Sequence, residues 1–484
     1  MLCFGGMKPQ TALEQQLSAE VEWLRSELAR SDEVLLALQE RIAELEIAVA
    51  KGKKNSRTSS KPPSSDIVKP PRGGGQGGAK GKIGAQKGHE KHTRPPFGPE
   101  AVSAVHTHTS SGCPFCKNKG VIRVPDLFRA VQQVEVKQSP LEVDEHRGLG
   151  YWCPKCKRFH YAPLPPAVEK GGLIGPILTA QIAYMKGAMH ASFSTIRKYV
   201  RDVMGLTISR GQLSKVIGKV SEALAQPHAD LVALLQSEAV LNVDETGHKD
   251  NGKKFWTWCF RGKEHCVFTV ASTRSTQVLL DMLGEEFEGV IGCDHFSAYR
   301  KYLRECDVRV QFCLAHFIRE IKFLTTLPQV TAVHYGNRLL ERIRTLFFAI
   351  HNKDLFSPAK FTHALEAVRA AIVEEAQRDV PAVREAQLIA KRLREYEDEY
   401  FEFIRTPAID PTNNLAEQMM RFVAIDRHIT QGTRSEKGRQ WSERIWTVLA
   451  TCLMQGRSAY DYLVEVVQAH FNGEPIPTLI PHPT

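Results

Sequence analysis

Long apolar runs are missing from this sequence: no stretch approaches the roughly 20 residues that a membrane-spanning helix needs. We also expect no secretory leader, because the first seven residues are too short and too weakly basic for a signal peptide. The 42% hydrophobic content is typical of a globular protein. At 484 residues the chain is too long for one ordinary core, so we expect two to four structural units. Without a membrane-spanning run or a leader, the expected location is the cytoplasm.

Cysteines are few and odd in number, eleven in all, and a protein without an export signal is not expected to depend on disulfides. Four of them form two Cys-Pro-x-Cys pairs separated by 36 residues, within a predicted unit over 101–165. Two such pairs can bring four thiolates to one tetrahedral zinc, whose role would be structural because no position stays open. Four buried thiols are the alternative. The expected zinc ligands are Cys113, Cys116, Cys153 and Cys156.

The positive charge of the chain is concentrated in one segment. The net charge is +10 and the isoelectric point is near 9.0, yet residues 51–100 alone hold 12 Lys and Arg against 3 Asp and Glu, a net charge of +9. This segment is rich in Pro, Gly, Ser and Lys and cannot bury enough apolar area to offset chain entropy, so we expect a disordered basic linker. A localised basic stretch favours a polyanionic partner, although a solvated spacer is the alternative.

Residues 11–50 carry an apolar seam with heptad spacing, which predicts a coiled coil and hence a homo-oligomer. An amphipathic helix folded back onto its own domain is the alternative. The seam positions are Leu17, Val21, Leu24, Leu28, Ser31, Leu35, Leu38, Ile42, Leu45 and Val49.

Residues 172–230 are expected to form a helical, DNA-binding-like domain. Residues 192–204 and 209–220 have the lengths and the short connection of a helix-turn-helix, with a serine as N-cap of the second helix. Exposed polar positions at the start of that helix are candidate DNA contacts, although this geometry is also common in proteins that never touch DNA. These positions are Arg210, Gln212 and Lys215.

Residues 238–470 are expected to form a catalytic domain with a mixed sheet. The pattern predicts three consecutive strands, a helix over 275–283, and then two further strands, an order that suits a ribonuclease H-like fold. Helices rich in Arg and Glu over about 320–405 would form an insertion. The predicted strands are 239–243, 255–260, 266–270, 289–293 and 309–313. The predicted fold class is therefore multidomain α+β.

Two predicted strands end in acids, Asp244 and Asp294. A carboxylate at a strand end is rigidly held yet faces solvent, which suits a hard divalent cation. Phosphoryl transfer on DNA commonly uses two such ions, and a third carboxylate is available in Glu417 at a predicted helix start. The alternatives are ordinary turn acids and a capping box in which Glu417 pairs with Asn414.

Six segments in collinear order, spanning about residues 50–470, resemble the large transposase protein of the insertion sequence 66 family. Each segment is weak alone, but their common order is specific. They are KKNSRTSSKPPSSD, the two cysteine pairs, DETG at Asp244, CDHFSAY at Asp294, CLAH at 313–316, and PTNNLAEQMMR around Glu417.

The resemblance implies that Asp244, Asp294 and Glu417 are catalytic acids holding two magnesium ions, which manganese can replace. It also implies cleavage at the ends of an insertion sequence and transfer of the freed 3′-hydroxyl into target DNA. The expected partners are double-stranded DNA at element ends and target, a second copy of the chain, and small accessory proteins of the same element. The location would then be nucleoid-associated. A non-catalytic DNA-binding regulator is the alternative, but it would not need the three acids together.

The chain departs from the family pattern at two places. Arg57 and Thr58 alter the spacer before the Pro-Pro-Ser-Ser-Asp segment, and Glu320 stands in what is usually a basic run. Cys313 and His316 form a Cys-x-x-His pair, but two ligands are too few for zinc. We therefore expect a packed cysteine and a site-facing His316 that supports the acids or contacts DNA.

Overall fold

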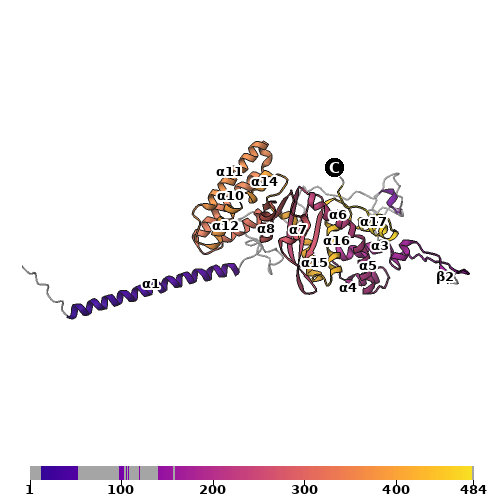
Figure 1. Cartoon of the computed structure of the whole chain (residues 1–484), viewed down its shortest axis with the longest axis horizontal. Helices are drawn as coiled ribbons and strands as arrows, with labels where there is room; N and C mark the ends of the chain where they lie inside the picture. The colour runs from indigo at the N-terminus through magenta and orange to yellow at the C-terminus, as the bar shows by residue number, and fades with distance from the viewer. Residues whose placement is uncertain are drawn as a thin grey trace, which may run out of the picture.

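The computed structural model describes residues 12–52, 98–102, 105, 107, 119, 140–155 and 158–481. Its first element is one continuous helix, α1 (Ala12–Gly52), which projects away from the rest of the protein (Figure 1). The helix predicted over 11–50 is thereby confirmed. The seam side chains from Val21 to Val49 whose burial is described are between 46% and 65% exposed, so pairing of this helix with a partner stays a prediction.

A short antiparallel hairpin follows, made of β1 (Gly150–Cys153) and β2 (Arg158–Tyr161). Cys153 ends β1, with its backbone opposite Arg158. The other three predicted zinc ligands lie outside the described residues, so the zinc site also stays a prediction. They are Cys113, Cys116 and Cys156.

Five helices lie within residues 166–234, where the sequence predicts a helical region over 172–230. Two of them begin at serine N-caps: the Ser192 hydroxyl accepts the Thr195 N–H (3.1 Å), and the Ser209 hydroxyl accepts the Gln212 N–H (3.0 Å). These caps start the two helices of the predicted helix-turn-helix, α4 and α5. The helices of this region are α2 (Pro166–Gly171), α3 (Pro176–Gly187), α4 (Phe193–Asp202), α5 (Arg210–Ala223) and α6 (Ala225–Leu234).

A mixed five-stranded sheet forms the centre of the protein, in the order β5-β4-β3-β6-β7. The first three strands in the chain pair antiparallel, and β6 and β7 then add in parallel beside β3. All five predicted strands are present. They are β3 (Val240–Asp250), β4 (Lys253–Arg261), β5 (Cys266–Ala271), β6 (Val290–Cys293) and β7 (Arg309–Phe312).

The prediction that a strand ends at Asp244 is wrong, because β3 continues to Asp250. The antiparallel partner β4 pairs with β3 over the whole stretch from Asn242 to Asp250. The parallel partner β6 pairs with β3 only from Val240 to Asn242. Asp244 therefore lies just beyond the parallel half of the sheet rather than beyond the strand itself.

The core of the sheet is apolar on both faces. All four residues of β6 are buried, as expected for a parallel strand covered on both sides. Trp258 on β4 is fully buried and meets the ring of Tyr299 edge-on at 6.0 Å. The covering helices around the sheet are α7 (Thr276–Leu283), α8 (Ser297–Cys306), α15 (Asn414–Thr430), α16 (Glu436–Met454) and α17 (Ala459–Asn472).

The chain between β7 and α15 is helical and forms its own group beside the sheet (Figure 1). The helices expected over about 320–405 are thus present, whereas their being an insertion into a ribonuclease H-like fold stays a prediction. No described helix is long and apolar enough to cross a membrane. The helices of this group are α9 (Leu314–Leu324), α10 (Val330–His351), α11 (Pro358–Gln377), α12 (Arg384–Glu395), α13 (Glu397–Tyr400) and α14 (Glu402–Arg405).

Candidate active site

The two aspartates lie at the same edge of the sheet because their strands are parallel neighbours. The last pair in the register of β3 and β6 is Asn242 with Gly292. Asp244 stands two residues after Asn242, and Asp294 stands two residues after Gly292. Parallel register thus places both carboxylates where the two strands separate.

The third acid, Glu417, is carried by the first turn of α15, which is fixed to β3 by a buried asparagine pair. Asn413, only 2% exposed, donates through its side-chain amide to the Val243 carbonyl (2.7 Å). Its side-chain oxygen accepts the amide N–H of Asn242 (3.0 Å). A Cβ on Gly292 would come within 2.6 Å of the Asn242 amide nitrogen, so the glycine makes room for this contact.

Glu417 does not act as a helix cap, so the capping-box alternative is wrong. The N-cap of α15 is Asn413, and no side chain caps it. The Glu417 carboxylate instead points at α9: Oε1 lies 3.6 Å from His316 Nδ1, and Oε2 lies 3.5 Å from an Arg319 guanidinium nitrogen.

Cys313 connects α9 to both α15 and β6. Its buried sulfur accepts the Asn413 backbone N–H (3.1 Å), and its own N–H donates to the Cys293 carbonyl (2.8 Å). Burial raises the pKa of the Cys313 thiol to about 11, so the group is protonated at neutral pH. The expectation of a packed cysteine is therefore confirmed, whereas the role of His316, which lies beside Glu417, stays a prediction.

Glu417 adds a third ligand-type side chain to the Cys-x-x-His pair, which the sequence interpretation missed. The ligand atoms of Cys313, His316 and Glu417 all lie within 4.8 Å of one another. Within the described part of the chain, His316 Nδ1 and Glu417 Oε1 are buried and make no hydrogen bond. Buried polar atoms without partners are costly, which makes this corner receptive to a cation or a bridging water.

The acids interact electrostatically, which changes the pKa of Asp244. Burial raises the pKa of the Asp244 carboxyl well above its usual range, and the charges of Glu245, Asp294 and Glu417 raise it further. The Asp244 carboxylate accepts only one described backbone hydrogen bond, from the Glu245 N–H (2.9 Å). A divalent cation would relieve this repulsion, and carboxylate oxygens are ligands that magnesium accepts.

Glu245 is a further buried acid that the sequence interpretation did not single out, although it stands inside the DETG motif. Its carboxylate accepts hydrogen bonds from the Arg274 guanidinium (2.7 Å from Nε) and from the Tyr299 hydroxyl. Burial and Asp294 together raise its pKa to about 7, against the opposing effect of Arg274. The Arg274 guanidinium carbon also lies 3.7 Å from the centre of the ring of Phe296, which stands two residues after Asp294 in the sequence.

The three predicted DNA-contacting residues lie in the first turns of α5, away from the acids. Arg210 and Lys215 are exposed, and Gln212 is half-buried. The Arg210 guanidinium donates to the Ser194 hydroxyl (2.7 Å) on α4, so it also joins the two helices.

Comparison with known families identifies the family of the chain. The model of the transposase IS66 family matches residues 171–441, more than half of the chain. The chain belongs to this family. The match contains all three acids, and it makes this IS66-family protein a transposase that acts on DNA.

A second model, described as a family of unknown function (DUF6444), matches residues 8–95 of this transposase. That stretch includes α1 and most of the basic segment after it. No curated relative matches the chain.

Proposed function

We propose that this transposase cuts DNA at the ends of its insertion sequence and joins the freed 3′-hydroxyl to target DNA. We infer that the sheet and its helices form a ribonuclease H-like domain, supported by three antiparallel strands followed by two parallel ones. The observation that carries the proposal is that Asp244 and Asp294 stand where their parallel strands separate, with the start of the Glu417 helix held against β3 by the Asn242–Asn413 pair.

The three acids would hold magnesium, and manganese can take its place. When bound, a pair of such ions would activate the attacking oxygen and stabilise the negative charge on the leaving oxygen. Family membership supports use of a divalent metal, and the carboxylate donors fit one.

The rest of the site holds these acids in place. The Asn242–Asn413 pair fixes the start of α15 against β3, so the Glu417 backbone cannot drift from Asp244. Arg319 places a positive charge beside Glu417 and limits repulsion among the acids. Glu245, held by Arg274 and Tyr299, fixes β3 against the chain leading into α7 and against α8. Such fixed geometry is what in-line phosphoryl transfer requires.

The remaining parts of the chain would bind and pair DNA ends. We propose that α1 joins two copies of the protein, and that the basic segment 51–100 adds affinity for any DNA sequence. The cysteine pairs would hold a structural zinc, and small proteins of the same element would assist. A regulator without catalysis remains the second candidate, favoured only by the helix-turn-helix.

The test is a cleavage assay with purified protein, candidate element ends and magnesium. Asp244→Asn, Asp294→Asn and Glu417→Gln should each lower cleavage by at least about 100-fold, because each removes a ligand charge without leaving a void. DNA binding should stay within about threefold of wild type. Near-normal cleavage by any one variant would remove that residue from the proposed site, and no cleavage by wild type on any end would favour the regulator.

A further inference from the structure

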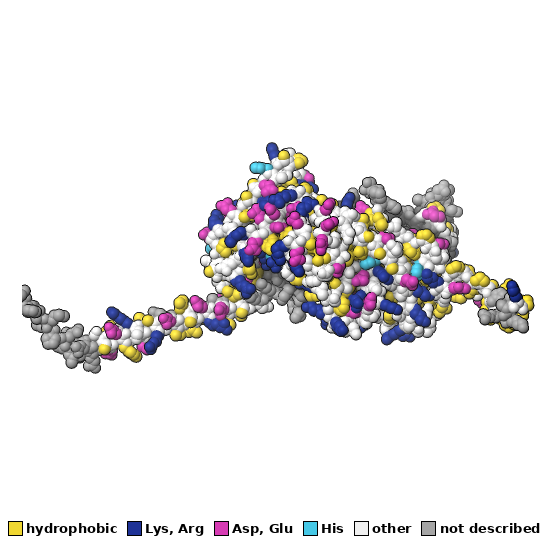
Figure 2. Space-filling view, in the orientation of Figure 1, with side chains coloured by type: hydrophobic (Ala, Val, Ile, Leu, Met, Phe, Trp, Pro, Cys, Tyr) yellow, Lys and Arg dark blue, Asp and Glu magenta, His cyan; other side chains and the backbone are white. Residues whose placement is uncertain are grey.

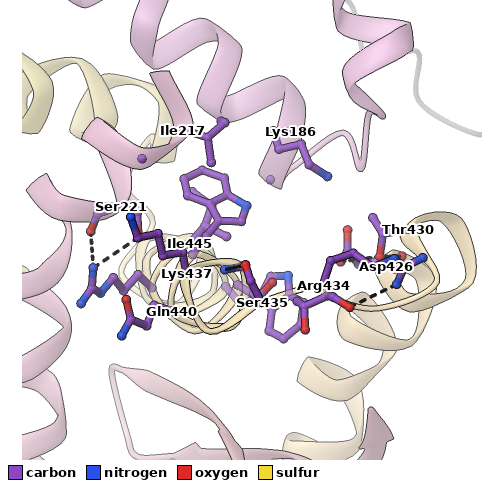
Figure 3. Close-up of a pocket in the computed structure, with 18 of the residues that line it drawn as sticks. Lys186, Ile217, Ser221, Asp426, Thr430, Arg434, Ser435, Lys437, Gln440 and Ile445 are labelled. Atoms are coloured by element: carbon purple, nitrogen blue, oxygen red, sulfur yellow. Dashed lines mark hydrogen bonds between the residues drawn. The ribbon is translucent and has the colours of Figure 1, made fainter. Parts of the chain in front are cut away.

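A second feature of this protein is a cavity of about 800 Å³ that lies away from the three acids. Helices α3 and α5 form one side, and the end of α15 with the start of α16 forms the other (Figure 3). The volume is in the range of binding pockets for small molecules or for one or two units of a polymer.

The lining of this cavity is basic. Two acids, Glu222 and Asp426, stand among five cationic side chains, and Asp426 is already bonded to His190 (3.0 Å). Figure 3 shows Lys186 pointing from α3 toward Asp426. The five cationic side chains are Lys186, Arg427, Arg434, Lys437 and Arg444.

Two of the guanidiniums are held in place by neutral oxygens. Arg427 donates to the Gly247 carbonyl and to the Thr246 hydroxyl (3.1 Å). Arg434 donates to the carbonyls of Gln431 (3.2 Å) and Thr433 (3.1 Å). These contacts orient the guanidiniums without cancelling their charge, which leaves them suited to an anion.

The loop that carries Arg434 is itself rigidly attached to the sheet. The Thr433 N–H donates to the Lys249 carbonyl (2.9 Å), and the Asn251 N–H donates back to the Thr433 carbonyl (2.9 Å). Gly432, with φ of +86°, lies so close that a Cβ would stand 2.2 Å from the Lys249 carbonyl oxygen. The cationic wall is therefore built before any ligand arrives.

The opposite wall offers space for a bulky ligand. Gly218 on α5 lines the cavity, and a Cβ added there meets no described atom within 4 Å. Ser214 lies one turn earlier on the same face of the helix and lines the cavity too. Figure 2 shows Lys and Arg side chains gathered along the edge of the protein where α4, α5 and α15 lie.

The distance from the acids matches a short length of DNA. β3 runs from Asp244 to His248 at the cavity, about 13 Å at the usual strand rise. α15 runs from Glu417 to Arg427, about 15 Å at the usual helix rise. DNA advances about 3.4 Å per base pair, so the cavity lies about four base pairs away from the acids.

We propose that this cavity binds the sugar-phosphate backbone of DNA about four base pairs from the bond that the transposase cuts. The recognition is of phosphate charge rather than base sequence, since two of the five cations of the lining are fixed by neutral oxygens, beside apolar side chains such as Trp441 and Ile445. The inference rests on the proposed function for the position of the cut, but DNA binding itself can be measured without cleavage.

The binding experiment uses the full chain carrying Glu417→Gln and a labelled 30-base-pair duplex at several salt concentrations. Adding Arg434→Gln with Lys437→Gln should weaken binding about tenfold or more and lower the salt slope by about two, one for each phosphate that is no longer neutralised. The charge-matched control is Lys353→Gln with Lys360→Gln, both exposed and outside the cavity lining, which should change neither quantity. Equal effects of the two pairs would overturn the proposal.

Two substitutions at Gly218 separate the effect of side-chain charge on DNA binding from the effect of side-chain size. Gly218→Glu and Gly218→Lys both fill the space and both improve helix propensity, but they differ in sign. The glutamate variant should bind DNA about tenfold more weakly than the lysine variant. Identical binding by the two variants would mean that DNA does not enter the cavity.

Two further binding measurements test where DNA lies on the protein and whether DNA is the ligand of the cavity. The first uses DNA with a cleaved end in which one phosphate at a time is replaced by an uncharged group. Replacement about four base pairs from the cut should weaken binding by the wild-type protein. The same replacement should not weaken binding by the Arg434→Gln, Lys437→Gln variant. Inorganic phosphate or ATP binding at micromolar concentration, abolished in that variant while its DNA affinity is unchanged, would assign the cavity to a free nucleotide and overturn the proposal. Loss of cleavage in the acid variants is independent of all these outcomes.

Discussion

Asn413 connects the sequence of α15 to the geometry of the acids. Its side chain bonds β3 through the Val243 carbonyl and Asn242, and its backbone N–H bonds Cys313. Asn413→Ala leaves buried polar groups on β3 unpaired, at a cost of about 1–3 kcal/mol for each such group. We expect a lower melting temperature and a cleavage rate reduced by at least about tenfold.

The neighbouring asparagine provides the control for this prediction. Asn414 is exposed, so Asn414→Ala should leave both melting temperature and cleavage close to wild type. Equal behaviour of the two variants would mean that the buried pair does not position Glu417.

The carboxyl of Asp244 should destabilise the metal-free fold at neutral pH. Its folded-state pKa is raised, so the folded protein keeps a proton that the unfolded chain loses, and stability falls as pH rises from the unfolded value through the folded one. Asp244→Asn removes this cost. With metal chelated, the variant should therefore melt above wild type at pH 8, and the gain should disappear near pH 4.

Asp281→Asn, at an exposed position on α7, is the control for thermal denaturation and should change little at either pH. If Asp244→Asn is less stable than wild type at both pH values, the carboxylate contributes favourable contacts instead of repulsion.

The sequence was enough to propose the three acids, whereas most of the contacts that hold them in place could not be predicted from it. Asp244 and Asp294 follow apolar strand residues, and Glu417 stands in a recognisable segment. Asn413 acts through a strand about 170 positions earlier in the chain, and no local pattern connects the two. Glu245 was visible in its motif, but its role depends on a buried partner, Tyr299.

At the scale of elements, local patterns predicted all five strands and the two capped helices. The predicted end of β3 at Asp244 is wrong, and the sequence contained a feature that indicates the correct end. Asp250-Asn251-Gly252 is a segment typical of a hairpin turn, and the structure has positive φ at Asn251 and Gly252, with β4 beginning at Lys253. A tight turn there requires β3 to reach Asp250, whereas its polar second half gave no apolar run to extend the strand.

The cysteine pairs are an element-scale prediction that can be measured directly. Protein purified without chelator should contain about one zinc per chain, and Cys113→Ser or Cys116→Ser should lower that content and expose the unit to protease. Cys306→Ser is the control, since Cys306 belongs to neither pair and lies on α8. A metal analysis without zinc in fresh protein would end this assignment.

At the scale of the whole molecule, α1 is a long helix whose apolar seam faces solvent. Transposition must hold two DNA ends together, and a paired α1 would do so. Leu24→Glu with Leu38→Glu should dissociate the pair, because each change places a charge in the seam. Glu20→Gln with Glu40→Gln, outside the seam, is the control. Sedimentation should detect monomers only for the seam variant; a seam variant that stays dimeric would place the contact elsewhere.

Metal ligation by Asp244, Asp294 and Glu417 is the central claim, and a change of ligand tests it most directly. Asp294→Cys replaces a hard oxygen by a softer sulfur, which disfavours magnesium far more than manganese. Under reducing conditions, this variant should lose at least about 100-fold in cleavage rate with magnesium and recover much of it with manganese, while Asp294→Asn recovers with neither ion. Equal loss with both ions for the cysteine variant, or cleavage that persists with magnesium, would contradict ligation by Asp294.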